Sequence, residues 1–222
     1  MWEAGRADVE TGNVDADPVP TAASLRWGVS IVARVALPSA ETLQALADRC
    51  RHLCGENHTL YTRANVHVTV RSCEFHRFGV LQNDPFIRAC QTVLADVCQR
   101  HDALEIAYCG LNANRTGVIV QGYPVTNALQ ALREDLHNRL GELGVRRGPE
   151  KNGVRRTAHI SVAVFGGAVA NPSSLHRWIR SNRETWFGTA RITRLTLVKY
   201  DRTAYDVKLI PFADFALRNS EL

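Results

Sequence analysis

Two short stretches of the sequence place a histidine beside a hydroxyl side chain in an otherwise apolar run. One stretch reads HVTV and contains His67 and Thr69, and the other reads HISV and contains His159 and Ser161. Successive side chains of a β-strand point to opposite faces, so each histidine shares a face with the hydroxyl two positions later. Each stretch therefore predicts a strand that buries its valine and isoleucine face and turns an imidazole and a hydroxyl toward a cleft.

These residue types can perform acid–base chemistry on a phosphate ester. Two imidazoles can act near neutral pH as general base and general acid, and the hydroxyls can donate hydrogen bonds to phosphoryl oxygens as charge develops. A zinc site is less favoured, because two histidines leave it short of a third ligand and no HExxH motif occurs. A serine nucleophile is also disfavoured, because the sequence contains no GxSxG.

Chance is the alternative explanation of the pattern. The chain has 8 histidines, and Ser or Thr fills about one position in eight, so about one His-x-Ser/Thr is expected by accident. Here two occur, both in predicted strands and both followed by valine. A paired functional site accounts for this better than two histidines that are hydrogen-bonded in a core.

The elements around the two stretches occur twice in the order strand, helix, strand, helix, strand. The apolar periodicity predicts strands at 25–35, 65–75, 103–111, 117–123, 157–165 and 190–200, and a last strand near 204–212. Helices between them are predicted to begin at Ser39, Asp84-Pro85, Thr126 and Asn171-Pro172. Equivalent prolines recur at a nearly fixed spacing, 86 positions from Pro38 to Pro124 and 87 from Pro85 to Pro172. This spacing indicates an internal repeat.

We therefore expect an α+β fold with two lobes, built from internally duplicated β-α-β-α-β units whose mainly antiparallel sheets face a central cleft. Residues 25–222 would form one bilobal domain, with repeats at about 25–111 and 117–200 and a closing hairpin strand that turns at Asp201-Arg202. Residues 1–24 are rich in Asp, Glu, Gly, Pro and Ala, and we expect a disordered acidic tail there.

The composition is that of a soluble globular protein, with 45% apolar and 22% charged residues. No apolar run approaches the ~20 residues of a membrane span, and the acidic N-terminus does not resemble a signal peptide. The 6 cysteines form no CxxC pair, which favours free thiols in a reducing cytoplasm. The net charge of +5 fits a polyanionic partner, although many proteins without one share it.

At this point the sequence resembles the two-histidine phosphoesterase superfamily, in its branch of RNA ligase-like and RNA 2′,3′-cyclic phosphodiesterase proteins. That family carries two His-x-Thr/Ser-x motifs with a hydrophobic last position, which HVTV and HISV match. The stretch NVHVTVR looks like the surroundings of the first motif, and residues 192–212 look like the closing strand pair. The resemblance covers about residues 25–215, and Ser161 keeps the hydroxyl where threonine is commoner.

The resemblance implies metal-independent hydrolysis or transesterification of phosphodiesters with a 2′-linked phosphate, without a cofactor. The family's substrates include 2′,3′-cyclic phosphates, ADP-ribose cyclic phosphate, 2′-5′ linked oligonucleotides and RNA 3′ ends, and the sequence does not choose among them. We expect a monomeric cytoplasmic enzyme in which His159 is the base and His67 the acid, while Thr69 and Ser161 hold the phosphoryl oxygens. The alternative is a non-catalytic RNA-end or nucleotide-binding protein on the same fold, which would need no titrating pair.

Four further residues are candidates for substrate binding. Arg71 follows His67 and Thr69 on the same predicted face, where it would contact a phosphate or form an ion pair at the rim. The loop of residues 144–156 leads into His159, and it either flanks the cleft and attracts a polyanion or is simply solvated. Its basic residues are Arg146, Arg147, Lys151, Arg155 and Arg156, of which the last two are the candidates. Tyr205 is a candidate for stacking on a base, as Tyr61, Tyr123 and Tyr200 also are, although packing is the simpler role for each.

Overall fold

The computed structural model describes residues 2–17, 19–22, 24–35 and 40–219. The described residues form five helices, α1 (Trp2–Thr11), α2 (Ala40–Cys54), α3 (Pro85–Arg100), α4 (Ala128–Glu142) and α5 (Pro172–Ser181). They also form nine strands, β1 (Ser30–Arg34), β2 (His58–Leu60), β3 (His67–Ser72), β4 (Leu104–Asn114), β5 (Gly117–Pro124), β6 (Ala158–Phe165), β7 (Trp186–Ile192), β8 (Arg194–Arg202) and β9 (Val207–Ala216). Pro38 and the predicted cap Ser39 lie outside the described residues.

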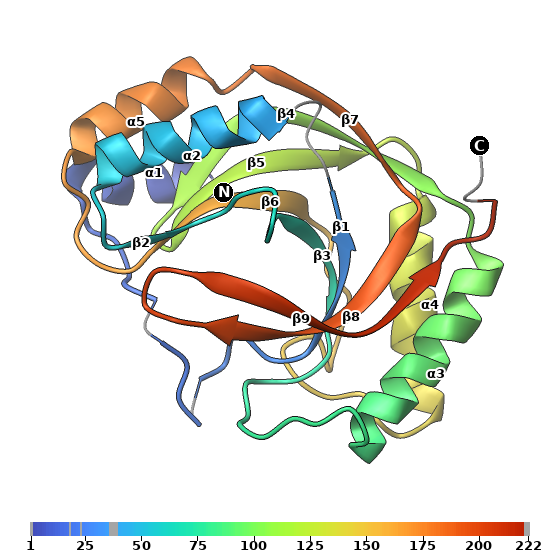
Figure 1. Cartoon of the computed structure of the whole chain (residues 1–222). Coiled ribbons are helices and arrows are strands. Elements are labelled where there is room, and N and C mark those ends of the chain that lie inside the picture. Colours follow the sequence, from blue (N-terminus) through green and yellow to red (C-terminus); the bar gives the residue numbers. More distant parts are fainter. Residues whose placement is uncertain (1, 18, 23, 36–39, 220–222) are drawn as a thin grey trace.

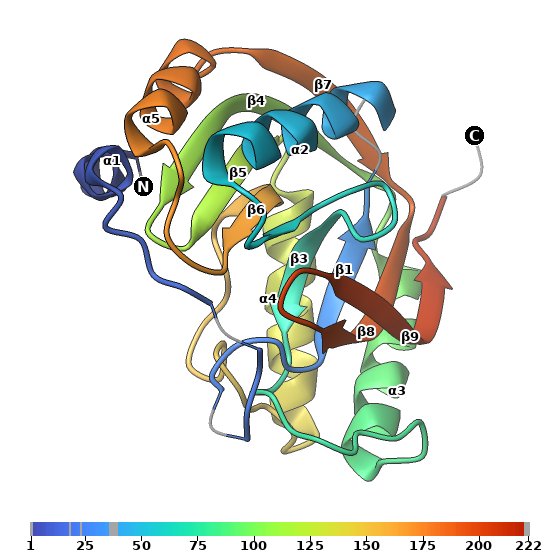
Figure 2. The same cartoon turned by 60° about the vertical axis from the view of Figure 1, so that its left-hand side comes forward.

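The strands join in one antiparallel sheet whose order is symmetric about its centre. The order is β7-β4-β5-β6-β3-β1-β8-β9, with β2 paired to the far end of β6. Counted outward from the middle, β6, β5, β4 and β7 of one half correspond to β3, β1, β8 and β9 of the other. The two strands that carry the histidine motifs are therefore neighbours at the centre of the sheet (Figure 2). This arrangement confirms the predicted α+β fold of duplicated, antiparallel units.

Helices cover the two halves of the sheet in an exchanged pattern (Figure 1). Helix α4 follows β5 in the chain but packs on β3, and α2 follows β1 but packs on β6 and β2. The half around β3 is covered by α3 and α4, and the half around β6 by α1, α2 and α5. Each repeat thus contributes strands and helices to both halves, which ties the two halves together.

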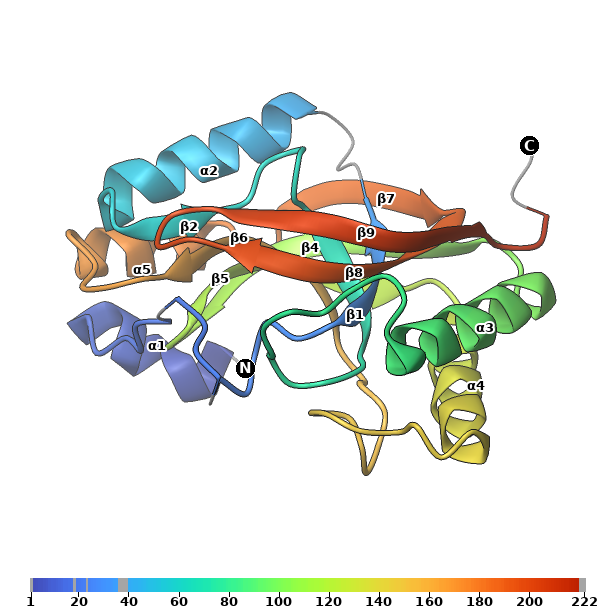
Figure 3. The same cartoon turned by 60° about the horizontal axis from the view of Figure 1, so that its bottom comes forward.

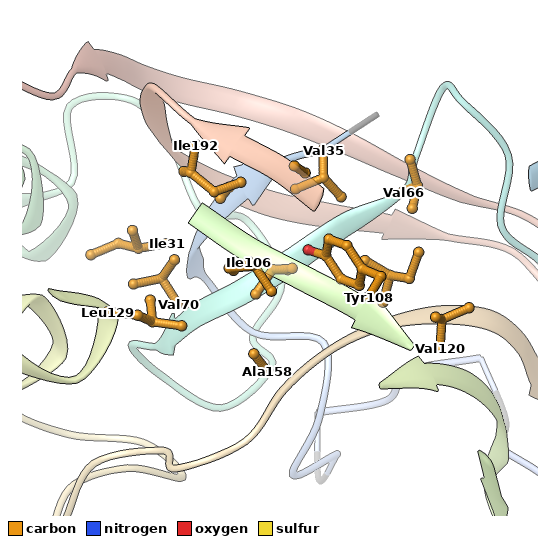
Figure 4. Close-up of a cluster of buried hydrophobic side chains, with 14 of the residues drawn as sticks. Ile31, Val35, Val66, Val70, Ile106, Tyr108, Val120, Leu129, Ala158 and Ile192 are labelled. Atoms are coloured by element: carbon orange, nitrogen blue, oxygen red, sulfur yellow. The ribbon is translucent and has the colours of Figure 1, made fainter. Parts of the chain in front are cut away.

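One hydrophobic core runs through both halves. Figure 4 shows side chains from β1, β3, β4, β5, β6, β7 and α4 in one cluster. Its members include Ile31, Val70, Ile106, Val120 and Ile192, each exposing 2% or less of its surface. Burial of this kind contributes about 1.5–3 kcal/mol per large side chain, so the relative position of β3 and β6 is fixed by packing on both sides of the junction.

Several boundaries differ from the sequence-based prediction. The strand predicted at 25–35 is shorter, because β1 begins at Ser30, and the short strand β2 was not predicted. The single strand predicted at 190–200 is two strands, because residues before Thr193 pair with β4 and residues after it pair with β1 and β9. The chain passes there from one edge of the sheet to the other half. The closing hairpin is confirmed, but its turn comes later than Asp201-Arg202, which both belong to β8. The predicted helix starts at Asp84-Pro85 and Asn171-Pro172 are confirmed. Thr126 accepts a hydrogen bond from the Ala128 amide at 3.2 Å, just before α4 begins.

The N-terminal segment also differs, because residues expected to be a disordered tail form α1 and pack on the protein. Val9 is fully buried, and a Cβ on Gly5 would lie 2.9 Å from Asn114 Cα of β4, so the helix approaches the sheet very closely. Asp15 forms an ion pair with Arg115 at 2.8 Å. The acidic composition suggested a solvated tail, whereas these acids have basic partners on the folded domain.

Candidate active site

The two histidine motifs meet at a single pair of residues. Strands β3 and β6 are bridged through Val68 and Ile160, the residues that separate each histidine from its hydroxyl. The antiparallel register then sets His67 across from Ser161 and Thr69 across from His159. All four side chains line one pocket of about 230 Å³. The structure therefore brings together the four residues that the sequence singled out.

Arg133 of α4 supports this junction from behind. Its guanidinium is buried, with 2% exposure, and donates to the carbonyls of Thr69 and Thr157 at 3.0 Å each. It also donates to the carbonyls of Val70 at 3.0 Å and Arg155 at 3.1 Å. Burial lowers the pKa of Arg133 to about 10, so it remains a cation at neutral pH. One side chain thus ties both histidine strands together where they share only one bridge.

The ring of His67 is held at both nitrogens. Its Nδ1–H donates to the Asn65 carbonyl at 2.8 Å, and the Tyr200 hydroxyl donates to Nε2 at 3.2 Å. Asn65 is itself buried, donating from Nδ2 to the Val207 carbonyl at 3.1 Å and accepting at Oδ1 from the Thr62 amide at 2.7 Å. The anchored Nδ1–H fixes the tautomer, which leaves the Nε2 lone pair directed at Tyr200 in the pocket.

His159 has a different environment. Its Nδ1 is buried and has no hydrogen-bond partner among the described residues. Its positively charged neighbours include Arg155 and Arg133. An unpaired ring nitrogen among cations favours the neutral imidazole.

Both histidines are held uncharged in the ligand-free protein. Burial lowers the pKa of His67 to about 4, against a raising effect of the Asn65 carbonyl, and Arg34 and Arg155 add to the lowering. Burial likewise lowers the pKa of His159 to about 4, and Arg155 is its next largest cause. A bound anion would offset both causes, because it brings negative charge to a site in which cations and desolvation disfavour the imidazolium.

Arg155 is one of the two arginines that line this pocket, and Arg26 is the other. Its Nε donates to Glu150 Oε1 at 3.1 Å and its Nη2 to the Ser72 hydroxyl at 3.3 Å. Glu150 also accepts at Oε1 from the Ser72 amide at 3.2 Å, which fixes the loop against the end of β3. Arg155 is 26% exposed, so the guanidinium is positioned but remains open to a ligand.

Comparison with family models matches residues 37–204 to the 2′-5′ RNA ligase superfamily. The chain belongs to this superfamily. The family and the fold are those of the two-histidine phosphoesterases, which act on phosphodiesters, and both histidine motifs lie within the matched residues. A comparison with the curated proteins finds no match.

Solved structures of the superfamily fold resemble this one at low sequence identity. TT0787 of Thermus thermophilus is 12% identical, with a TM-score of 0.63 over 87% of this chain and 100% of that one. LigT of E. coli in complex with 3′-AMP is 14% identical, with a TM-score of 0.57 over 86% of this chain and 98% of that one. ATU0111 of Agrobacterium tumefaciens, a conserved protein of unknown function, is 14% identical, with a TM-score of 0.54 over 93% and 97%.

Arg71 does not line the pocket of this superfamily member, contrary to the expectation that it shares the face of His67 and Thr69. In the pairing of β1 with β3, Ile31 is opposite Arg71 and the next residue, Val32, is opposite Thr69. Val70 therefore has no partner residue on β1 and forms a bulge. A bulge reverses the alternation beyond it. Ser72 consequently reaches the pocket, while Arg71 is buried beneath α4 and donates to the Glu150 carbonyl at 3.0 Å.

Other predicted residues lie apart from the pocket as well. Arg156 lines a separate groove, the loop groove, which is formed by residues 148–157 and Phe75. Tyr205 is 60% exposed in the turn between β8 and β9. Arg146 donates to His137 of α4 at 2.6 Å, and Arg147 to Glu74 at 2.6 Å, so much of the basic loop is anchored to the protein. Arg155 is the basic residue of this loop that lines the pocket.

Six further residues of the pocket were not predicted as site residues. They are Arg26, Trp27, Ser30, Tyr61, Ser72 and Tyr200. Of these, the sequence analysis named Tyr61 and Tyr200 only as possible stacking residues. The sequence does carry a weak signal for Tyr200. It lies in the strand predicted at 190–200, where alternation turns it to the face opposite Lys199. No sequence signal marks Arg26 and Trp27, which fall within the strand predicted at 25–35 but precede β1 (Ser30–Arg34) in the structure.

Among the described residues, no three histidine, cysteine, aspartate or glutamate side chains gather as a metal site. Nor does any helix of the described part of the chain have the length and apolar character needed to cross a membrane.

The lowered histidine pKa values predict that acid destabilises the fold. Between pH 6.5 and about 4 the unfolded chain binds a proton at His67 that the folded protein does not, so stability is lost as the pH falls. We expect the free energy of unfolding to drop from pH 6.5 to pH 5 by about 2 kcal/mol more in the wild type than in His67→Gln.

Urea unfolding at pH 7, 6 and 5 measures this difference. His52→Gln, at an exposed position of α2, is the matched control for the loss of a histidine. Equal slopes for His67→Gln and the wild type would show that His67 titrates alike in the folded and unfolded states.

Proposed function

We propose that this protein is a metal-independent phosphodiesterase that hydrolyses 2′,3′-cyclic phosphates or 2′-5′ linked phosphodiesters of nucleotides or RNA ends. The observation that carries the proposal is the placement of His67, His159, Thr69 and Ser161 around one pocket through the pairing of Val68 with Ile160. Membership of the superfamily supports it. LigT structures that contain 3′-AMP, phosphate, ATP or NADP⁺ support a nucleotide as the ligand of this fold.

The phosphodiester anion would bind between the two histidine strands. The hydroxyls of Thr69 and Ser161 donate to its non-bridging oxygens, and the Arg155 guanidinium compensates its charge. In the ligand-free protein both imidazoles are neutral, so the reactive state needs one proton. Binding of the anion favours uptake of this proton, because negative charge raises the pKa of a nearby imidazole.

His67 is assigned as the acid and His159 as the base. A protonated His67 keeps its Nδ1–H bond to the Asn65 carbonyl, which stabilises the imidazolium and leaves Nε2–H to donate toward the leaving oxygen. His159 has no such acceptor at Nδ1 among the described residues, so its neutral form persists and can take a proton from water. Water forms the new P–O bond, the P–O bond to the ribose oxygen breaks, and that oxygen receives the proton of His67.

The site requires no second subunit, since both histidines come from one chain, and we expect a monomer. All six cysteines are free thiols, and a cytoplasmic location would keep them reduced. A nucleotide-binding protein without turnover is the competing function. Hydrolysis of a cyclic nucleotide by the purified protein would exclude this alternative, whereas tight binding without product would favour it.

Loss of either histidine should abolish most of the turnover. We expect His67→Ala and His159→Ala each to lower kcat for a 2′,3′-cyclic nucleotide by about 10²–10⁴, the usual contribution of one acid or base. The double variant should be little worse, because the pair works as a unit. EDTA should leave the wild-type rate unchanged. A near wild-type rate in His67→Ala, or strong inhibition by EDTA that a divalent ion reverses, would contradict the mechanism.

Arg155→Gln should change both affinity and pH dependence. Removing a charge-assisted hydrogen bond of about 1.5–3 kcal/mol should raise KM roughly tenfold or more. Because Arg155 lowers the pKa of both histidines, its loss should also move the pH profile of kcat/KM to higher pH. Arg156→Gln is the matched control, since Arg156 is adjacent in the chain but lines the loop groove and not the histidine pocket. Equal effects of the two substitutions would remove Arg155 from the phosphate site.

A further inference from the structure

A second pocket of about 550 Å³ adjoins the histidine pocket, and we refer to it as the outer pocket. The two pockets share four residues, Trp27, Gly28, Glu74 and Tyr200. At about 230 Å³, the histidine pocket is smaller than the roughly 300–1,000 Å³ of sites that enclose a drug-sized ligand. It can hold a phosphate with the sugar atoms beside it, and the remainder of a nucleotide needs the space next to it.

Three segments that are distant in the sequence form the walls of the outer pocket. They are residues 19–20 and 27–29 of the N-terminal segment, Glu74 and residues 76–80 after β3, and the β8–β9 hairpin with Lys199 and Ile210. Figure 3 shows the N-terminal segment and the loop after β3 on the same side of the β8–β9 ribbon. The apolar part of the wall includes Val29 and Val80, and Phe78 is 67% exposed beside it. Such a wall suits a flat, partly apolar group.

Trp27 stands where the two pockets meet, and the protein holds it in an unusual backbone conformation. Its φ angle is 66°, in the left-handed region that residues other than glycine seldom adopt. Its Nε1–H donates to the Asp17 carboxylate at 3.0 Å, and the Arg202 guanidinium lies 4.6 Å from its ring centroid. A conformation of this kind persists only where several contacts enforce it, and it marks positions of functional use.

Two residues of the outer pocket carry buried acceptor atoms without partners. Glu74 is only 4% exposed, and its Oε2 accepts from Arg77 Nε at 2.9 Å and from Arg147 Nη2 at 2.6 Å. Its Oε1 has no partner among the described residues, and neither does Nε2 of His76. The Nδ1 of His76 lies 3.4 Å from the Trp27 carbonyl, to which it donates, so Nε2 is an acceptor. A buried acceptor is costly unless something donates to it.

We propose that the outer pocket binds the nucleoside part of the substrate, and that Glu74 and His76, whose free acceptor atoms are covered in the ligand-free protein, turn toward it to accept hydrogen bonds from its N–H or O–H groups. This inference rests on the proposed function, because it extends the substrate from the phosphate between the histidines. A 2′,3′-cyclic nucleotide offers two sources of such donors that the reaction leaves intact. One is the amino edge of the base, and the other is the 5′-hydroxyl of the ribose.

The test compares affinities in the His159→Ala background, by calorimetry, so that the result does not depend on turnover. The ligands are adenosine 2′,3′-cyclic phosphate and three analogues of it. Purine riboside 2′,3′-cyclic phosphate lacks the amino group, the 5′-deoxyadenosine analogue lacks the 5′-hydroxyl, and methyl riboside 2,3-cyclic phosphate lacks the base. We expect loss of the base to weaken binding at least tenfold, and loss of one donor to weaken it by about tenfold.

A substitution that fills the outer pocket provides the second arm. Ile210→Trp adds bulk at a residue of β9 that lines the pocket and is 36% exposed, so folding should not suffer. It should remove the advantage of the adenosine ligand over the methyl riboside ligand. Lys208→Trp, on the same face of β9 but outside the pocket lining, should preserve that advantage.

The outcomes separate this inference from the proposed function. Equal affinities for the adenosine and methyl riboside ligands, or an unchanged difference in Ile210→Trp, would overturn the outer pocket as a nucleoside site. A dependence on the base that survives both donor deletions would overturn the role of Glu74 and His76. Failure of the wild type to hydrolyse any of the ligands would instead remove the proposed function, and would leave the binding result to stand by itself.

Discussion

The bridge between Val68 and Ile160 is the contact on which the rest of the site depends. It lies at the centre of a sheet whose halves mirror each other, so both histidine motifs reach the same place from opposite directions. Because side chains alternate along a strand, pairing the middle residues sets both histidines and both hydroxyls around one pocket. The exchanged helices, the shared core and the buried Arg133 all act to keep this junction in register.

The same burial that positions the histidines also removes their charge. Desolvation and the nearby Arg155 disfavour the imidazolium, while only His67 has a carbonyl that stabilises its protonated form. The ligand-free site is thus a neutral pair beside a cation, which suits an anion. In the proposed mechanism the reaction needs one further proton, and the negative charge of the substrate favours its uptake. The carbonyl beside His67, which His159 lacks among the described residues, is the difference on which the two proposed roles rest.

Sequence reasoning found the motifs because strand alternation is a strong local rule, and it found the duplication because the prolines and motifs recur at similar spacing. It misplaced Arg71 because a bulge reverses alternation, and nothing in the letters TVRS announces one. It expected disorder for the N-terminal residues from their composition. Their structure depends on contacts with distant parts of the chain, such as that of Gly5 with β4, which composition does not show. Arg133 escaped notice because it lies among the leucines of α4 and looks like an ordinary charged residue of an amphipathic helix.

Imidazole titration by ¹⁵N NMR tests the central claim most directly, with the protein free and with a non-hydrolysed 3′-nucleotide bound. The account predicts that His67 and His159 both titrate well below pH 6 in the free protein, with His67 as the Nδ1–H tautomer. Binding of the nucleotide should raise the pKa of His67 toward neutrality, with uptake of a proton at Nε2. Two histidines that titrate near their ordinary pKa and do not respond to the nucleotide would contradict the account of a coupled acid–base pair.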